Sequence, residues 1–84
     1  MADGSDDDNQ TLDSNNIYLF MDDFESKTVR PVIEFILKKN LIQGSARPKH
    51  LTLIICSPGG EVSSAMALID VMRGSTIPVH TVGI

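Results

Sequence analysis

The sequence contains one cysteine, one tyrosine, no tryptophan and no basic residue before Lys27. A single cysteine cannot form an internal disulfide bond, and it fits a reducing compartment. No apolar run approaches the length of a membrane span. The acidic N-terminus resembles neither a secretory nor an organellar targeting segment. We therefore expect a cytoplasmic protein with no membrane partner.

The charges are unevenly distributed along the chain. Eight of the eleven acidic residues precede Lys27, whereas the chain from Lys27 onward has seven basic and three acidic residues. These basic residues are scattered and not interleaved with aromatic residues, so we expect no nucleic-acid partner. Residues 1–15 contain five aspartates, one leucine and no aromatic residue, which predicts a disordered acidic tail. The run Asp6–Asp8 could bind a divalent cation, but we favour a solvated tail and expect no metal and no cofactor.

The next segments predict a strand and then a helix. Residues 17–20, IYLF, are short, apolar and β-prone. After a turn, apolar residues at i, i+3, i+4, i+7 and i+8 form one helical stripe: Val29, Val32, Ile33, Ile36 and Leu37. We expect Thr28 to be the N-cap, because Pro31 then lies in the first turn, where an N–H has no partner. The helix is expected to end at about Asn40.

A second strand, a second helix and a third strand follow. Residues 51–56, LTLIIC, are apolar at five of six positions without alternation, which predicts a strand covered on both faces. A helix is expected over about 61–73 with Gly74 as its C-terminal glycine, and a strand from near Val79. This β-α-β-α-β order predicts an α/β fold with a parallel sheet. Because Ile84 falls inside the third strand, we expect residues 16–84 to be the N-terminal part of a larger domain.

Residues 57–60, SPGG, join the second predicted strand to the second helix. A glycine-rich turn lets the backbone approach a ligand, and the first N–H groups of the helix remain unpaired. Such donors can hold a phosphate or the oxyanion of a tetrahedral intermediate. The spacing is neither G-x-G-x-x-G nor G-x-x-x-x-G-K-[ST], which disfavours phosphate. On the motif alone, a turn that only changes the chain direction is an equally good interpretation.

The wider sequence resembles the first half of the Clp protease proteolytic subunit. The matching stretches are NIYLF, LTLIICSPGGEV, A-x-x-L-I-D-V-M and IPVHTVGI, in that order from Asn16 to Ile84. This resemblance implies a self-compartmentalising serine peptidase with a crotonase-like fold. In that family two stacked rings of seven subunits enclose the active sites, and a ring ATPase feeds in unfolded polypeptides. The implied partners are like subunits, polypeptide substrates and a Clp-type ATPase.

The resemblance also assigns roles to the motif. Gly60 matches the position whose backbone N–H lines the oxyanion hole, and Ser57, Pro58 and Gly59 would shape the turn. The catalytic serine is expected just beyond Ile84, with the histidine and aspartate later, so these 84 residues alone are expected to be inactive. Replacing Gly60 with proline is expected to remove the donor and preserve the fold, if the local φ is near the proline value.

Some positions depart from the family pattern. Relatives commonly have aromatic residues where this chain has Thr52, Ile54 and Gly74, in the surface pocket that accepts the docking loop of the ATPase. Partnership with an ATPase therefore does not follow from the resemblance. Two alternatives remain open: a non-catalytic subunit of a Clp-like ring, and a crotonase-type acyl-CoA enzyme that uses the same glycine N–H.

Other nucleophile candidates need a base. Three serines lie in or beside the motif: Ser57, Ser63 and Ser64. A serine nucleophile requires a positioned base, and the chain offers only His50 and His80, which we interpret as structural or surface residues. Ser57 is expected to bond the turn backbone or to help start the helix. We interpret Cys56 as a buried structural cysteine, and Met66 and Met72 as core residues.

Overall fold

The computed structural model describes residues 16–84. The predicted acidic tail, residues 1–15, lies outside the described part of the chain. The elements in chain order are β1 (Ile17–Met21), α2 (Ser26–Asn40), the short 3-10 helix η1 (Gly44–Ala46), β2 (Leu51–Cys56), α3 (Val62–Gly74) and β3 (Val79–Gly83). This order confirms the predicted β-α-β-α-β arrangement.

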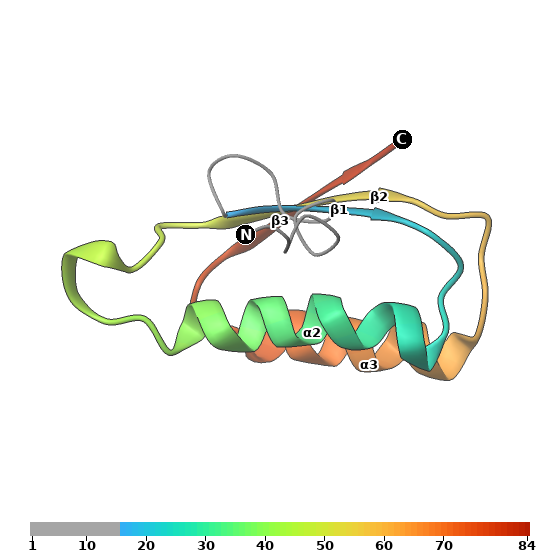
Figure 1. Ribbon diagram of the computed structural model, residues 1–84, viewed down its shortest axis with the longest axis horizontal. Helices are drawn as coiled ribbons and strands as arrows, with labels where there is room; N and C mark the ends of the chain where they lie inside the picture. The colour runs from blue at the N-terminus through green and yellow to red at the C-terminus, as the bar shows by residue number, and fades with distance from the viewer. Residues whose placement is uncertain (1–15) are drawn as a thin grey trace, which may run out of the picture.

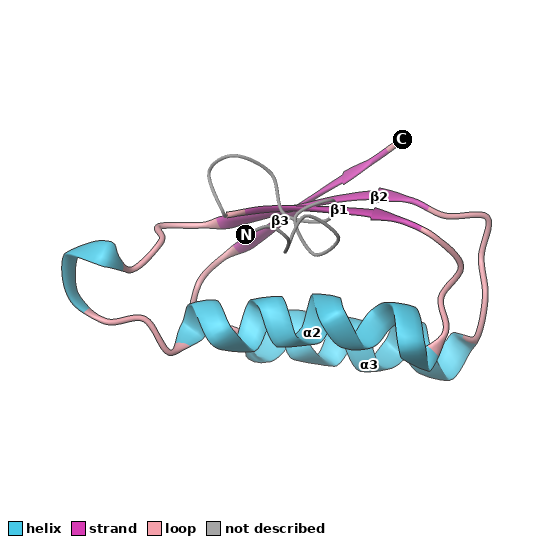
Figure 2. Cartoon of the chain, viewed as in Figure 1, coloured by secondary structure: helices cyan, strands magenta, loops and turns pink. Residues whose placement is uncertain are grey.

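The three strands form one parallel sheet in the order β1-β2-β3. The register pairs Tyr18 with Leu53, and Leu53 with Thr81. Both crossover connections run in the same direction along the sheet, so connections of one hand place both helices on the same face. Figure 1 and Figure 2 show this two-layer arrangement, with α2 and α3 side by side beneath the strands.

The expectation that the second strand is covered on both faces is wrong for the described residues. Leu51 and Leu53 are buried on the helix side, whereas Thr52 and Ile54 on the opposite face are only partly buried. Ile54 is apolar although it faces away from the helices, and this hides the alternation of burial in the sequence. The face opposite the helices is called the open face below.

The core lies between the sheet and the two helices. Its buried apolar side chains are Tyr18, Phe20, Val29, Val32, Phe35, Ile36, Leu51, Leu53, Leu68 and Ile77. The rings of Tyr18 and Phe35 pack with their centroids 5.3 Å apart, which ties β1 to α2. Burial raises the pKa of the Tyr18 phenol above its ordinary value, because the apolar surroundings disfavour tyrosinate.

The first helix begins earlier than Thr28. Glu25 is the N-cap residue and Thr28 occupies the third helical position, where its hydroxyl accepts the Glu25 N–H at 2.9 Å and donates to the Asp23 carbonyl at 2.6 Å. The Thr28 hydroxyl therefore takes part in capping the helix from inside its first turn, but Thr28 is not the N-cap residue that we expected. Pro31 consequently lies inside the helix, and the Lys27 carbonyl loses the i+4 donor that another residue would provide.

The second helix differs from its expected pattern at two positions. Gly74 is its last residue, but its φ is not positive, so it is not a left-handed cap glycine. Met66 is 48% exposed and is not a core residue, whereas Met72 packs against the core. Together with Val62 and Ile69, Met66 leaves an apolar stripe exposed along α3. In residues 16–84, no helix has the length and apolar character needed to span a membrane.

Candidate oxyanion site

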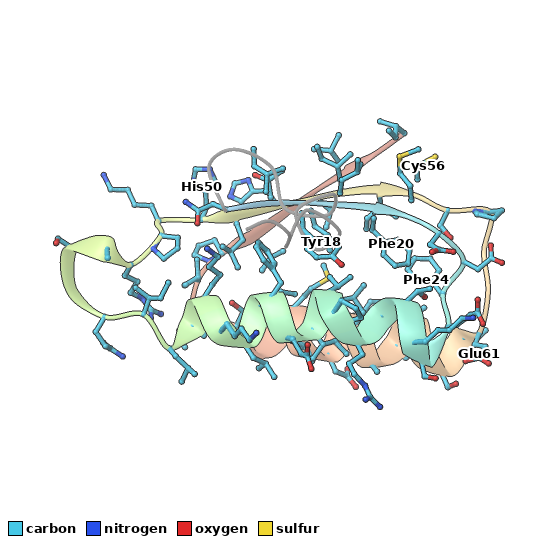
Figure 3. All side chains as sticks on the ribbon, in the orientation of Figure 1. Tyr18, Phe20, Phe24, His50, Cys56 and Glu61 are labelled. Carbon is cyan, nitrogen blue, oxygen red and sulfur yellow. The ribbon has the colours of Figure 1, made fainter. Side chains whose placement is uncertain are left out.

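The candidate site lies where the carboxyl ends of β1 and β2 meet. Residues 22–25 connect β1 to α2, and residues 57–61 connect β2 to α3. Because the two strands are parallel neighbours, both turns lie at the same edge of the sheet. Figure 3 shows Phe24 from the first turn and Glu61 from the second at this end of the molecule. Ligands of open α/β sheets bind at this edge.

The two turns are joined by a short parallel bridge between Phe24 and Gly60. The Phe24 N–H donates to the Gly59 carbonyl at 2.9 Å, and the Glu61 N–H donates to the Phe24 carbonyl at 2.7 Å. Phe24 is anchored in turn by its ring, which stacks on the core residue Phe20 with centroids 5.0 Å apart. The position of the glycine turn is therefore fixed by the core through Phe24.

Both glycines of the motif have a backbone conformation that favours glycine. Their φ values are +130° for Gly59 and +145° for Gly60. A Cβ on Gly59 would meet nothing within 4 Å, whereas a Cβ on Gly60 would lie 2.4 Å from the Phe24 nitrogen and 2.4 Å from its carbonyl oxygen. Gly59 is thus required by conformation alone, and Gly60 by conformation and by the close approach of another backbone segment.

The Gly60 N–H is a free donor within residues 16–84. The bridge uses the Gly59 carbonyl and the Glu61 N–H, so the N–H of Gly60 itself points away from Phe24. It makes no hydrogen bond to the described residues, and Gly60 is exposed. A rigidly held, unpaired N–H beside the start of a helix is the element from which an oxyanion hole is built.

Ser57 bonds the backbone of the turn through its hydroxyl. Its hydroxyl donates to the Gly59 carbonyl at 3.1 Å and accepts the Gly59 N–H at 3.2 Å. Pro58, between them, is exposed and removes one N–H from the turn. The three residues before Gly60 therefore fix the turn geometry without presenting a reactive side chain.

The start of α3 lies directly beside Gly60. Glu61 is the N-cap residue, and its carboxylate accepts a hydrogen bond from the Ser64 hydroxyl at 2.8 Å. Ser64 is 8% exposed and committed to this bond, so it is not available as a nucleophile. The positive end of the α3 dipole lies at this turn and favours negative charge there.

The histidines lie far from the motif. His80 pairs with Thr52 in the sheet, five residues before Ser57 along an extended strand. At about 3.3 Å per residue, Ser57 is roughly 16 Å from that level, and His50 precedes Thr52. Among the described residues, no histidine can act as base for Ser57 or Cys56. Cys56 is half-buried, not fully buried as expected.

The positions of the expected docking pocket are not gathered within this chain. Thr52 and Ile54 lie on the open face of the sheet, whereas Gly74 ends α3 on the opposite side. Phe24, in contrast, is a site residue that the sequence reading missed. The available signal was an aromatic residue inside the otherwise polar turn MDDFES of a chain with few aromatic residues.

The arrangement defines a parallel α/β domain with a glycine-rich strand-to-helix turn and a free backbone donor. A family model described as Clp protease matches residues 3–84, and the chain belongs to that family. The crystal structure of the ClpP protease catalytic domain from Plasmodium falciparum has a similar fold, with a TM-score of 0.74 at 21% sequence identity. That match covers 84% of this chain and 37% of the Plasmodium chain. A comparison with curated proteins found no match.

These comparisons confirm the family resemblance and the Clp-like fold that the sequence predicted. The chain spans 37% of the length of the Plasmodium catalytic domain. The boundary between a tail and a domain at residue 15 stays a prediction, as do the roles assigned to the SPGG residues.

Proposed function

We propose that residues 16–84 form the first part of a Clp-type serine endopeptidase subunit, and that Gly60 supplies one donor of its oxyanion hole. The nucleophilic serine, the histidine and the aspartate lie outside these 84 residues in this proposal. The observation that carries it is the free, exposed N–H of Gly60, held by the bridge to Phe24. Membership of the Clp protease family makes peptide hydrolysis the chemistry that this donor serves.

In the proposed reaction, the serine oxygen attacks the carbonyl carbon of a peptide bond. The carbonyl oxygen becomes an oxyanion, and the Gly60 N–H donates a hydrogen bond to it. The bridge holds this donor in place before the reaction, so little reorganisation is needed when charge develops. The positive end of the α3 dipole acts in the same direction. The fold thus contributes electrostatic stabilisation, and proton transfer belongs to residues outside the described part.

We further propose that the subunit assembles with like subunits into a heptameric ring, stacked as a double ring, in the cytoplasm. The apolar stripe of Val62, Met66 and Ile69 on α3 is exposed in the isolated chain and supports contact with another protein surface. By the resemblance, Thr52, Ile54 and Gly74 stand where relatives commonly have aromatic residues, so docking of a Clp-type ATPase is proposed to be weaker than in those relatives. Polypeptides remain the proposed substrates.

The test uses the protein encoded by the sequence extended beyond Ile84, with residues 1–84 as the control. A fluorophosphonate reagent should label one serine of the extended protein, and that protein should cleave a fluorogenic peptide. Residues 1–84 should show neither reaction, because no histidine of residues 16–84 can act as base for Ser57.

Two results would contradict the proposal. An extended protein that forms rings but is never labelled is a non-catalytic subunit. An extended protein that turns over an enoyl-CoA without labelling uses the Gly60 donor for a thioester carbonyl, which is the chemistry of a crotonase-type enzyme.

A further inference from the structure

The two histidines of the chain come together at the edge of the sheet opposite the SPGG turn. His50 immediately precedes β2, and His80 is the second residue of β3, paired with Thr52. Their ring centroids are 5.1 Å apart, with an angle of 52° between the ring planes. Both side chains are exposed. Figure 3 places His50 at the end of the sheet away from Cys56 and Glu61.

This separation fits two imidazoles bound to one tetrahedral metal ion. An imidazole nitrogen lies about 2.0–2.1 Å from Zn²⁺, which puts the ring centre about 3.2 Å from the ion. Two such rings at the tetrahedral angle have centres about 5.2 Å apart, whereas a right angle gives about 4.5 Å. The observed 5.1 Å agrees with the tetrahedral value.

We propose that His50 and His80 form a two-histidine site for a borderline divalent cation such as Zn²⁺. Residues 16–84 contain no group of three or more histidine, cysteine, aspartate or glutamate side chains that could hold a metal. As far as residues 16–84 supply the ligands, water occupies the remaining coordination positions, and the site is weaker than a structural zinc site. This proposal does not depend on the proposed peptidase function, because the site lies at the other edge of the sheet.

The surroundings of the pair are compatible with an ion. A hollow of about 360 Å³ beside His50 is lined by Asn16, Ile17, Lys49, His50 and Thr52. It leaves room for metal-bound water next to the His50 imidazole. Lys49 is exposed, and its ammonium group disfavours a nearby cation through repulsion that solvent reduces. Removing this charge should therefore tighten metal binding.

Binding would cross-link two neighbouring strands. His50 and His80 belong to segments that are separated by α3 in the chain, and a shared ion would tie the start of β2 to β3. The fold has one cysteine and no disulfide bond, so it lacks any other cross-link between these strands. A ligand that binds only the folded state raises the unfolding temperature. We therefore expect Zn²⁺ to stabilise the chain against heat.

The experiment is isothermal titration of the 84-residue chain with Zn²⁺, together with thermal unfolding with and without the ion. We expect one ion per chain, a higher unfolding temperature and no response to Mg²⁺, which prefers oxygen ligands. His50→Gln and His80→Gln should each weaken Zn²⁺ binding by about a hundredfold. The single remaining imidazole binds the ion without the added affinity that comes from two ligands held together. Circular dichroism should show both variants folded, since the two side chains are exposed.

Two matched variants separate this site from other binding modes. Lys49→Gln keeps both imidazoles and should bind Zn²⁺ at least as tightly as the parent chain. Cys56→Ser removes the single thiol and should leave the affinity unchanged, which excludes zinc binding through Cys56. The proposal is overturned if Zn²⁺ fails to raise the unfolding temperature, if either His variant binds like the parent, or if Cys56→Ser abolishes binding.

Discussion

At the scale of single residues, glycine is required at the two positions of SPGG for different structural reasons. Gly59 has a φ of +130°, and a Cβ added to it would meet nothing within 4 Å, so only its backbone conformation requires glycine. Gly60 has a φ of +145° and also lies against the Phe24 backbone. Proline at Gly60 is not the fold-preserving change that we expected from the sequence, because its ring fixes φ near −65° and its side chain would strike Phe24.

These differences predict an order of stability for alanine variants. Gly59→Ala should lower the free energy of unfolding by about 1–3 kcal/mol, the usual cost of a residue held at an unfavourable φ. Gly60→Ala should cost more, because its Cβ displaces Phe24 and breaks the two bridge hydrogen bonds. Denaturant unfolding followed by circular dichroism measures both changes.

Gly74→Ala is the control for this pair. Gly74 has an ordinary helical backbone and nothing within 4 Å of its added Cβ. Alanine there should stabilise the protein by about 0.5–1 kcal/mol. Equal losses for Gly59→Ala and Gly60→Ala would contradict the close approach of Phe24 to Gly60.

At the scale of elements, the connections between strands and helices are joined at both ends of the sheet, by different kinds of hydrogen bond. The carboxyl edge uses the backbone bridge between Phe24 and Gly60. The opposite edge uses the side chain of Asn40, at the end of α2. Its amide donates to the Ile36 carbonyl at 2.8 Å and to the Ser75 hydroxyl at 2.9 Å, and its oxygen accepts the Thr76 N–H at 2.7 Å. One side chain thus connects the end of α2 to the loop before β3.

This network predicts that Asn40→Ala destabilises the fold. The change removes the acceptor of the Thr76 N–H and one donor to the Ser75 hydroxyl, which keeps its two hydrogen bonds to Ile77. A hydrogen bond contributes about 0.5–1.5 kcal/mol net. We expect a loss in that range in the free energy of unfolding, measured by denaturant titration. Gln43→Ala is the matched control, because Gln43 is exposed and its side chain makes no capping bond. Its effect should stay within about 0.5 kcal/mol. An equally small effect of Asn40→Ala would show that the network contributes nothing.

At the scale of elements, too, the sequence predicted some features and missed others. The second strand begins and ends where the sequence predicted, at Leu51 and Cys56, because polar segments flank this β-prone run on both sides. The start of α2 was misplaced, since the sequence does not show whether the Thr28 hydroxyl caps the helix or bonds back to Glu25. The contact of Phe24 with Gly60 joins residues far apart in the chain, and no local pattern predicts it. The pairing of His50 with His80 depends in the same way on the strand register.

At the scale of the whole molecule, one face of the sheet is covered by helices and the other is not. This asymmetry follows from two crossovers in the same direction along a parallel sheet. It leaves Leu19, Ile54 and Val82 on the open face, and Val62 and Met66 exposed on α3. Apolar surface on both sides of such a small fold is typical of a surface that further protein structure covers.

The central claim is that the Gly60 N–H stabilises the oxyanion during peptide cleavage. The most direct measurement replaces this single amide by an ester, with glycolic acid in place of Gly60, in the extended protein that carries the serine. The ester removes the N–H and adds no side chain, so the strained backbone is retained. An ester at Glu61 is the control, because it removes the N–H that donates to the Phe24 carbonyl.

We predict that the Gly60 ester assembles like the parent protein but cleaves a fluorogenic peptide about a hundred to a thousand times more slowly, the usual effect of losing one oxyanion donor. The Glu61 ester should lower the melting temperature and lose less activity than the Gly60 ester, because the other bridge hydrogen bond, from the Phe24 N–H to the Gly59 carbonyl, remains. Cleavage by the Gly60 ester at the parent rate, or an equal loss in both esters, would contradict the oxyanion role of Gly60.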